Sequence, residues 1–324
     1  MTNKLPTFLV VGAAKCGSTS LYHYLDAHPD VYMSPIKETN YFAADLRANR
    51  FSATYRRAAN YPGCIKRYGS IDNYLDSDLS ERVFFTIDIQ TLDQYRKLFK
   101  NVCNEKAIGE VSNSYLFSPI AAAEIRRTIP DVRIVMILRD PIRRMWSHYR
   151  AKAKTGLLAR GFRREIMADM HKKRKGWCIS HNFFEMGRYY AQVKRYYDLF
   201  PHDKILVLLN EDLKERHRET LAKLYGFLGV KMHAVPATKH NTGPTPRSAL
   251  LANAMRRARL SFGSIQKLPP PLNTTIMSVL YRPATPRPPL DEKLSRLLTE
   301  YYRDDVKRLA DLINRDLSAW LQIE

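Results

Sequence analysis

The segment Phe8-Leu-Val-Val-Gly12-Ala-Ala-Lys15-Cys-Gly17-Ser-Thr-Ser20 decides the fold of this chain. It begins with a short apolar run, which is typical of a strand that is covered on both faces. A glycine-rich loop follows, and Leu21-Tyr-His-Tyr-Leu25 then places apolar side chains at helical spacing. A strand, a loop and a helix in this order begin an α/β unit, so the sequence predicts an α/β fold.

Further apolar runs predict the rest of the sheet. Buried strands are expected at 83–87, 107–111, 134–138 and 205–209, and helices at 120–129, 189–200, 213–228 and 291–312. Strands that alternate with helices indicate a central, mainly parallel sheet flanked by helices. Its ligand site, like that of P-loop proteins, should lie at the carboxyl ends of the strands.

The whole chain, residues 1–324, is expected to be one domain, since 45% of its residues are hydrophobic and no biased tract divides it. Residues 239–290 are rich in Pro, Thr and Arg, and no acidic residue stands between Leu250 and Leu290. We predict that this segment is an irregular basic excursion over the core. Residues 291–324 should form a C-terminal helix with Asp291 as its N-cap.

The charge of the chain predicts an anionic partner. Lys and Arg number 53 against 32 Asp and Glu, which gives a formal net charge of +21. A polyanionic glycan, a phosphorylated nucleotide or an acidic membrane would fit this charge, and solubility alone is the alternative. Nucleic acid is not expected, because no nucleic-acid-binding motif accompanies the charge. Leu250 to Phe262 combines leucines with arginines and is compatible with peripheral contact at an anionic bilayer.

The compartment is inferred from the same sequence. The start of the chain has no apolar signal segment, and its longest apolar runs are too short to cross a bilayer. The four cysteines, Cys16, Cys64, Cys103 and Cys178, stand singly, without the spacing of a zinc site or a disulfide framework. A reducing, cytoplasmic location is the simplest interpretation.

The first loop has the spacing of a phosphate site. Gly12 and Gly17 match the Gly-x-x-x-x-Gly pattern, in which backbone N–H groups surround an anion at the start of a helix. In a nucleoside-triphosphate loop, Lys follows the second Gly, whereas here Ser18 and Thr19 follow it and the loop lysine is Lys15. We expect Lys15 to contact an oxygen of the ligand, and Ser18 and Thr19 to donate to a 5′-phosphate without a metal. A Gly-rich turn that binds nothing is the alternative.

A second anion-binding position is predicted at the end of the strand 134–138. Arg139 stands at the exit of this strand, Pro141 can begin a helix, and Ser147 lies about two turns into that helix. Packing explains an arginine at the carboxyl end of a parallel strand poorly. An ion pair with Asp140 or Glu110 is the structural alternative.

These two motifs together resemble those of sulfotransferases that use 3′-phosphoadenosine 5′-phosphosulfate (PAPS). Val10 to Leu21 is similar to the 5′-phosphosulfate loop of that family, and Arg139 with Ser147 is similar to its 3′-phosphate motif. The likeness is closest to the branch that contains the heparan-sulfate and other carbohydrate sulfotransferases and their bacterial relatives. It covers nearly the whole chain, including Gly187-Arg-Tyr-Tyr190.

The resemblance implies the residues that would hold PAPS. Arg139 and Ser147 would bind the 3′-phosphate, and Arg282 or Arg287 would replace the Lys-Gly loop that closes over it in the family. The phosphosulfate would be held by the loop and the first helical turn, namely Lys15, Cys16, Gly17, Ser18, Thr19 and Ser20.

The resemblance also implies a general base. Related glycan sulfotransferases carry this Glu shortly before an aromatic pair, and Glu38 stands before Tyr41-Phe42. The alternatives are a solvated ion pair of Glu38 with Lys37 or Arg47, and a histidine base. The candidate histidines are His23, His28 and His148.

The acceptor side departs from the family pattern at two positions. Asn40 stands where several relatives have His, and Ser20 where others have Arg, so the identity of the acceptor stays open. Ser112 and Asn113 follow the strand 107–111 and are expected to line the acceptor cleft as hydrogen-bond donors. An ordinary capped turn is the alternative for this segment.

The sequence therefore predicts a cytoplasmic, PAPS-dependent sulfotransferase that acts on a hydroxyl of a carbohydrate, a glycolipid or a similar alcohol. Ten Lys or Arg between Arg150 and Lys175, against two acidic residues, favour a polyanionic or membrane-borne acceptor. The first alternative is a P-loop-type kinase of a small metabolite, which would need ATP and magnesium. The second is a non-catalytic basic module that binds membranes or nucleic acid. The oligomeric state is not indicated.

Overall fold

A computed structural model of the chain has a five-stranded parallel sheet at its centre. The structure describes residues 4–47, 52, 63–83, 89–154, 158, 160–236, 245–247, 251, 254–255, 265, 268–282 and 290–323. Of residues 63, 64, 66, 245, 246 and 282 it describes the backbone alone.

The elements follow one another as an α/β protein requires. The strands are β1 (Phe8–Gly12), β2 (Val31–Met33), β3 (Ala107–Val111), β4 (Arg133–Leu138), β5 (Ile205–Leu209), β6 (Thr245–Pro246) and β7 (Tyr281–Arg282). The α-helices are α1 (Ser18–Asp26), α3 (Gly63–Tyr68), α4 (Ile71–Asp76), α5 (Leu92–Lys97), α6 (Ser114–Phe117), α7 (Ala121–Thr128), α8 (Pro141–Lys154), α9 (Phe162–Met170), α10 (Tyr189–Tyr197), α11 (Asn210–Glu215), α12 (His217–Leu228), α15 (Leu272–Leu280) and α16 (Glu292–Ile313). Short 3-10 helices are η1 (Ala44–Leu46), η3 (Glu185–Gly187), η4 (His202–Lys204) and η5 (Ser318–Leu321).

The order of the strands fixes where a ligand can bind. In the sheet they run β2-β3-β1-β4-β5, so β2 and β3 lie on one side of β1, and the later strands β4 and β5 lie on the other. The register places Gly12 of β1 beside Met136 of β4, and Leu138 of β4 beside Leu209 of β5. The loops after β1 and β4 therefore open at the point where the strand order reverses, which is the usual ligand crevice of such sheets.

The expected sheet is confirmed, with small differences at its edges. Strands 107–111 and 205–209 have the expected bounds, whereas β4 begins one residue early, at Arg133. The sequence did not indicate β2, because three residues are too few for a periodic pattern. The expected strand 83–87 lies outside the described residues except for Val83, which makes one parallel bridge with Ile36.

One expected helix is wrong in its continuity. The segment 213–228 belongs to two helices, α11 and α12, which meet at Arg216 in a non-helical conformation. The Arg216 side chain bonds back to Asp212 at 2.5 Å. No Gly or Pro marks the break, so the sequence pattern did not reveal it.

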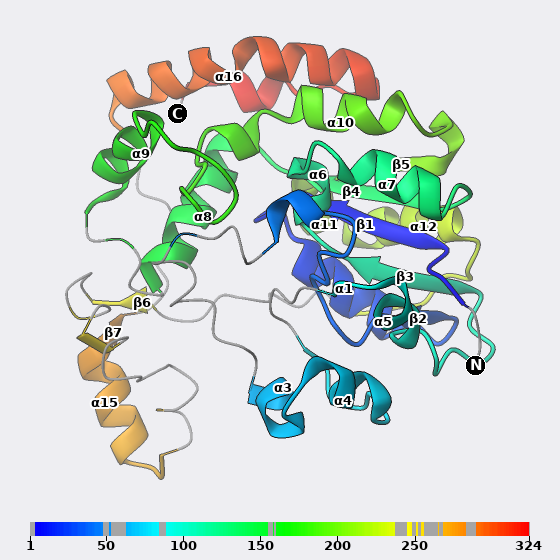
Figure 1. Cartoon of the computed structure of the whole chain (residues 1–324). Coiled ribbons are helices and arrows are strands. Elements are labelled where there is room, and N and C mark those ends of the chain that lie inside the picture. Colours follow the sequence, from blue (N-terminus) through cyan, green and yellow to red (C-terminus); the bar gives the residue numbers. More distant parts are fainter. Residues whose placement is uncertain are drawn as a thin grey trace.

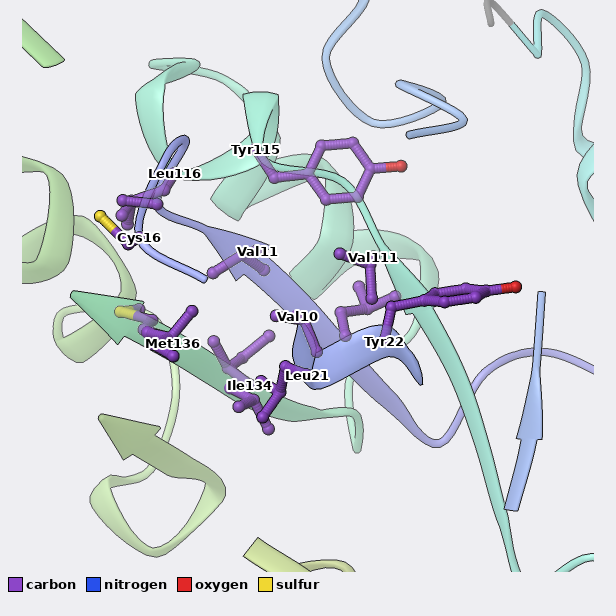
Figure 2. Close-up of a cluster of buried hydrophobic side chains, with 14 of the residues drawn as sticks. Val10, Val11, Cys16, Leu21, Tyr22, Val111, Tyr115, Leu116, Ile134 and Met136 are labelled. Atoms are coloured by element: carbon purple, nitrogen blue, oxygen red, sulfur yellow. The ribbon is translucent and has the colours of Figure 1, made fainter. Parts of the chain in front are cut away.

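The core lies on both faces of the sheet. Phe8, Leu9, Val10 and Val11 of β1 are completely buried, as a central parallel strand requires. Figure 2 shows Val10 and Val11 among side chains from β3, β4 and α1. In Figure 1, α10 and α16 lie above the sheet and α1 lies below it. Asp291 caps α16 as expected, since its Oδ1 accepts the N–H of Leu294 at 3.0 Å.

The segment 239–290 is more regular than the sequence suggested, in the part that the structure describes. β6 pairs antiparallel with β7, which follows α15 directly. Met255, Ile265 and Tyr281 form a small apolar cluster of their own. Figure 1 shows α15 and the β6–β7 pair projecting away from the central sheet. None of the helices in the described ranges combines the length and the hydropathy that a bilayer crossing requires.

Candidate functional site

The loop after β1 leads into the exposed N–H groups of a helix. β1 ends at Gly12, and Gly17 takes the left-handed conformation, φ 110°, just before α1 begins. Gly17 has no side chain that could cap the helix, so the first-turn N–H groups and the helix dipole are left for an anion. Ser18, Thr19 and Ser20 form that first turn, with Ser18 buried and the other two half-buried.

The end of β5 holds this loop in place. Asn210, the first residue after β5, donates from its Nδ2 to the carbonyl oxygen of Cys16 at 2.7 Å. A Cβ on Gly17 would lie 2.5 Å from the same Nδ2, so a larger residue does not fit beside it. The role of Asn210 was not predicted from the sequence, where the available signal was a polar residue at the carboxyl end of a buried strand.

Lys15 lies among charged side chains from three segments. Burial lowers the pKa of Lys15 to about 8, and the charge of Glu38 opposes this effect. The charges of Lys37, Lys152 and Lys154 lower the pKa of Lys15 further. We call Lys15, Lys37, Lys152 and Lys154 the lysine cluster. Of these four lysines, only Lys15 was predicted as a site residue. Lys152 and Lys154 were recognised only as part of the basic segment between Arg150 and Lys175.

Glu38 is held at the end of β3. Its backbone has φ 67°, and its N–H donates to the carbonyl of Val111 at 2.7 Å. Its Oε1 accepts from Lys37 Nζ at 2.7 Å and from Asn113 Nδ2 at 2.7 Å. The suggested ion pair with Lys37 is therefore present, yet the Glu38 side chain keeps 20% of its surface exposed. The carboxylate is oriented by two donors and still open to a ligand.

The other residues expected on the acceptor side lie behind Glu38. Ser112 is completely buried, and its hydroxyl donates to Glu110 at 2.5 Å. Asn40 is also buried, with its Oδ1 accepting from Ser114 at 2.5 Å. Ser112 and Asn40 therefore support the turn from within, and of the expected residues only Asn113 reaches Glu38.

Glu110 is the centre of that internal support. It is completely buried and accepts from Thr39 and Tyr95, each at 2.7 Å, as well as from Ser112 and Tyr115. Burial raises the pKa of Glu110, and these hydrogen bonds oppose the rise. Its hydrogen bonds thus hold the turn that carries Glu38.

Arg139 lies at the end of β4, at the reversal of strand order. It is half-buried, and its Nε is buried without a hydrogen-bond partner among the described residues. Asp140 instead caps α8, since its Oδ1 accepts the N–H groups of Ile142 at 2.7 Å and of Arg143 at 3.1 Å. Within the described ranges, Arg139 forms no ion pair with Asp140 or Glu110. Ser147 lies two turns along α8 and is half-buried.

Tyr189 contacts both the loop after β1 and the end of β4. Its hydroxyl donates to the carbonyl of Arg139 at 3.0 Å and lies 3.4 Å from Cys16 Sγ. Both Tyr189 and Cys16 are completely buried, and burial raises the pKa of the Cys16 thiol to about 11. Cys16 therefore packs inside the loop, where only its backbone can reach a ligand. The pattern Gly187-Arg-Tyr-Tyr190 did not predict this role of Tyr189.

The alternative bases have structural roles or stand apart from Glu38. His28 is buried, with Nε2 at 2.8 Å from the carbonyl of Lys231 and Nδ1 accepting the N–H of Asp30 at 3.0 Å. His148 is buried against the ring of Phe183, and burial keeps its pKa well below the usual value. His23 lies on α1, where its charge acts on Asp26.

Two expectations fall partly or wholly outside the described residues. The backbone of Arg282 belongs to β7 but its side chain is outside them, as is the whole of Arg287. Among the residues that the structure does describe, no three His, Cys, Asp or Glu side chains come together as metal ligands would.

The arrangement fits a nucleotide that carries phosphate groups at two places. The first turn of α1 with Lys15 is the position expected for one anionic group, and Arg139 with its unpartnered Nε is the position expected for the other. Glu38 acts on the charge of Lys15, so a carboxylate is available beside the first position for proton transfer. The buried Arg139 Nε, which has no partner among the described residues, is accounted for by such a ligand.

Comparison with known proteins agrees with this geometry. The family model described as "Sulfotransferase family" matches residues 6–234. Carbohydrate sulfotransferase 15 of Mus musculus is 24% identical over 258 residues, which cover 70% of this chain and 44% of that protein. The human bifunctional heparan sulfate N-deacetylase/N-sulfotransferase 3 is 23% identical over 235 residues, which cover 71% of this chain and 23% of that protein. The chain thus spans about half the length, or less, of these curated relatives.

A solved structure resembles the whole chain. The crystal structure of a sulfotransferase from Alicyclobacillus acidocaldarius is 27% identical and has a TM-score of 0.67. The match covers 98% of this chain and 100% of that chain. The resemblance inferred from the two motifs is confirmed.

Proposed function

The chain belongs to the sulfotransferase family, and from this premise we propose that it transfers a sulfuryl group from PAPS to a hydroxyl of a carbohydrate, a glycolipid or a similar alcohol. The observation that carries the proposal is that Tyr189 contacts both Cys16 in the loop after β1 and Arg139 at the end of β4, the two places that we propose bind the donor's anionic groups. Tyr189 links them through Cys16 and Arg139, so they are held at a fixed separation.

The donor would be held by both positions. The first turn of α1, with Lys15, would bind the phosphosulfate, and Ser18, Thr19 and Ser20 would donate to it. Arg139 and Ser147 would bind the 3′-phosphate, which ordinary adenylates lack. Arg282 or Arg287 would close over that phosphate.

The chemistry would need a base and a stabilised leaving group. When bound, PAPS supplies the sulfuryl group and leaves as 3′-phosphoadenosine 5′-phosphate. Glu38 would accept the proton of the acceptor hydroxyl while the oxygen forms its bond to sulfur in line with the breaking sulfur–oxygen bond. Lys15 would stabilise the electron pair that this bond leaves on the phosphate oxygen. Lys37 and Asn113 would hold the Glu38 carboxylate in position.

The acceptor and the location are part of the same proposal. Relatives that act on glycans and the basic residues between Arg150 and Lys175 support a glycan or another anionic acceptor. The cysteines, which stand singly in the sequence, support a cytoplasmic enzyme. The basic segment between Leu250 and Leu290, which contains no acidic residue, supports peripheral contact at an anionic membrane. Family membership favours neither a kinase nor a non-catalytic basic module.

A thermal-shift and binding comparison tests the donor. The protein is titrated with 3′-phosphoadenosine 5′-phosphate, with ATP and magnesium, and with adenosine 5′-phosphate. We expect the 3′-phosphorylated ligand to bind most tightly. Arg139→Ala should weaken that ligand by about 10–100-fold, because hydrogen bonds to charged groups contribute roughly 1.5–3 kcal/mol. It should leave adenosine 5′-phosphate binding nearly unchanged.

The matched control for this test is Arg143→Ala. The Arg143 side chain is half-exposed, and its Nε lies 3.6 Å from Oδ2 of Asp140. The substitution Arg143→Ala therefore removes a positive charge near Arg139 but changes no residue of the proposed site. Tighter binding of ATP with magnesium than of the 3′-phosphorylated ligand would contradict the proposal and favour a kinase.

A further inference from the structure

Arg144 is a buried cation that takes no part in the chemistry proposed above. It lies at the end of the first turn of α8, and its side chain is completely buried. Its Nη2 donates to the carbonyl of Phe183, and its Nη1 lies 3.5 Å from Nδ1 of His148 and 3.8 Å from Sδ of Met186. Its Nε is buried without a hydrogen-bond partner among the described residues.

The surroundings of Arg144 supply no opposite charge. In the described part of the chain, its guanidinium contacts a carbonyl, an imidazole and a thioether, and none of these groups is a carboxylate. The imidazole is neutral, because burial keeps the pKa of His148 well below its usual value and the charge of Arg144 lowers it further. Burying a charge without a partner costs free energy. A ligand that brings negative charge near Arg144 would offset this cost.

Arg144 lies behind both parts of the proposed donor site. Burial raises the pKa of the Cys16 thiol in the loop after β1, and the charges of Arg144 and Arg139 are among the effects that oppose this rise. Burial also raises the pKa of Tyr189, which the charge of Arg144 lowers. Arg144 stands three residues before Ser147, so the two side chains lie on one side of α8. The charge of Arg144 therefore acts on the loop and on the residue that joins it to the end of β4.

We propose that Arg144 is a positioning residue that strengthens donor binding through the field of its charge, without touching the donor. The inference rests on the proposed function and adds a residue to its donor site. A ligand in the crevice cannot reach Arg144, because the side chain is completely buried. Its charge would act on the phosphate groups through the protein interior, which weakens Coulomb interactions less than water does. The guanidinium stays protonated and is held by Phe183, so this attraction requires no rearrangement.

Nucleotides of different charge test this proposal. Calorimetry measures the affinity of the full chain for 3′-phosphoadenosine 5′-phosphate and for adenosine 5′-phosphate at pH 7 and one salt concentration. Arg144→Gln removes the charge but keeps an N–H donor for the carbonyl of Phe183. Because a Coulomb attraction grows with the charge of the ligand, affinity for the nucleotide with two phosphate groups should fall by about tenfold, and affinity for the other by about threefold.

Arg144→Lys separates the charge from the shape of the side chain. Lysine keeps the positive charge but lacks the planar guanidinium. Its affinity for 3′-phosphoadenosine 5′-phosphate should stay within about threefold of the parent value, because the field of the charge remains. A purely structural role of the guanidinium would make this variant as weak as Arg144→Gln. If Arg144→Gln does not fold, the lysine variant decides alone, and a tenfold loss in it overturns the proposal.

The matched control is Arg195→Gln. Arg195 also donates to a backbone carbonyl, that of Leu116 at 2.8 Å, and its Nε is also buried without a partner among the described residues. Burial lowers the pKa of Arg195, and the charge of Asp45 opposes this effect, so an acidic group acts on this arginine. Its replacement should leave the affinity for both nucleotides unchanged.

The outcomes separate this inference from the proposed function. If the parent chain does not bind 3′-phosphoadenosine 5′-phosphate more tightly than adenosine 5′-phosphate, the proposed function fails. If it does, the role of Arg144 is overturned by an Arg144→Gln chain that binds as the parent does, by equal losses for the two nucleotides, or by an Arg144→Lys chain that loses as much as Arg144→Gln.

Discussion

The donor side and the acceptor side of the crevice are built in different ways. We use donor side for the loop 13–17, the first turn of α1 and Arg139. It is fixed by backbone groups: Ala13 N–H bonds to Ile137 at 2.8 Å, and the carbonyls of Cys16 and Arg139 accept from Asn210 at 2.7 Å and Tyr189 at 3.0 Å. Changing one side chain leaves most of this frame intact.

The acceptor side, which comprises Glu38 and Asn113, depends on side chains. Two donors orient Glu38, one from its neighbour in sequence and one from Asn113. One backbone arrangement can therefore bind the same donor, while changes in a few side chains alter which acceptor is bound. This follows because function depends on the residues of a site and not on the fold alone.

The largest expected effect is on the acceptor side. Glu38→Gln keeps the shape and the oxygen that Lys37 and Asn113 bond, but it removes the base. We expect kcat to fall by about 10²–10⁴-fold, the usual contribution of general base catalysis. Binding of 3′-phosphoadenosine 5′-phosphate, measured by calorimetry, should change less than threefold. A Glu38→Gln enzyme with full turnover would remove this carboxylate from the mechanism.

A smaller effect is expected from pH on the donor side. Burial lowers the pKa of Lys15 from an ordinary 10.5 to about 8, so the donor-free protein loses this proton as pH rises through 8. An anionic ligand prefers the charged form of Lys15, so affinity for 3′-phosphoadenosine 5′-phosphate should be constant between about pH 7 and 7.5, where the ligand's phosphates, with a second pKa of about 6, are largely ionised. It should fall by up to about tenfold per pH unit above 8, by linkage.

Lys15→Arg is the control for this pH profile, because arginine stays charged over the whole range. Its affinity for the same ligand should be nearly independent of pH between 7 and 9. The lowered pKa of Lys15 also makes the stability of the protein depend on pH. Between pH 8 and 10.5 the unfolded chain binds more protons at Lys15, so this residue makes the free energy of unfolding rise with pH. A donor affinity in the parent chain that stays level to pH 9.5 would contradict the assignment.

The smallest expected effect concerns the link between the two anion positions. Tyr189→Phe removes the hydroxyl that bonds to Arg139 and contacts Cys16. One hydrogen bond contributes about 0.5–1.5 kcal/mol, so affinity for 3′-phosphoadenosine 5′-phosphate should fall by about 2–13-fold. Affinity for adenosine 5′-phosphate, which occupies one position only, should fall less.

Tyr225→Phe provides the comparison for that variant. Tyr225 is also buried and donates its hydroxyl to a backbone carbonyl, that of Tyr24 at 3.2 Å, away from the crevice. It should lower stability without changing the preference between the two nucleotides. If Tyr189→Phe lowered the affinity for both nucleotides equally, Tyr189 would support the fold and would not couple the two proposed anion positions.

The residues proposed for the donor side could be named from the sequence because most of them are contiguous. Gly12 to Ser20 lie in one loop and one helical turn, and Arg139 stands directly after a strand whose apolar run is easy to recognise. Asn210 and Tyr189 were missed, because their roles depend on strand order: they contact the loop only once β5 and α10 are placed beside β4 and β1.

The acceptor side was predicted in part. Glu38 and Asn113 were named, and the structure brings them into contact. Ser112 was expected to line the cleft but is buried, because its hydroxyl donates to Glu110, and Asn40, whose N–H donates to the Ser112 hydroxyl, is buried beside it. Nothing in the local pattern around Lys152 distinguishes it from an ordinary surface residue.

What the sequence determined by itself is the order of strands and helices, the phosphate loop and the arginine at the end of β4, since apolar periodicity and glycine spacing act over a few residues. The tertiary structure alone decided which side chains surround Glu38 and what joins the loop after β1 to the end of β4. The physical reason is that these features are contacts between segments up to 194 residues apart, as between Cys16 and Asn210, and only packing of the sheet brings such segments together.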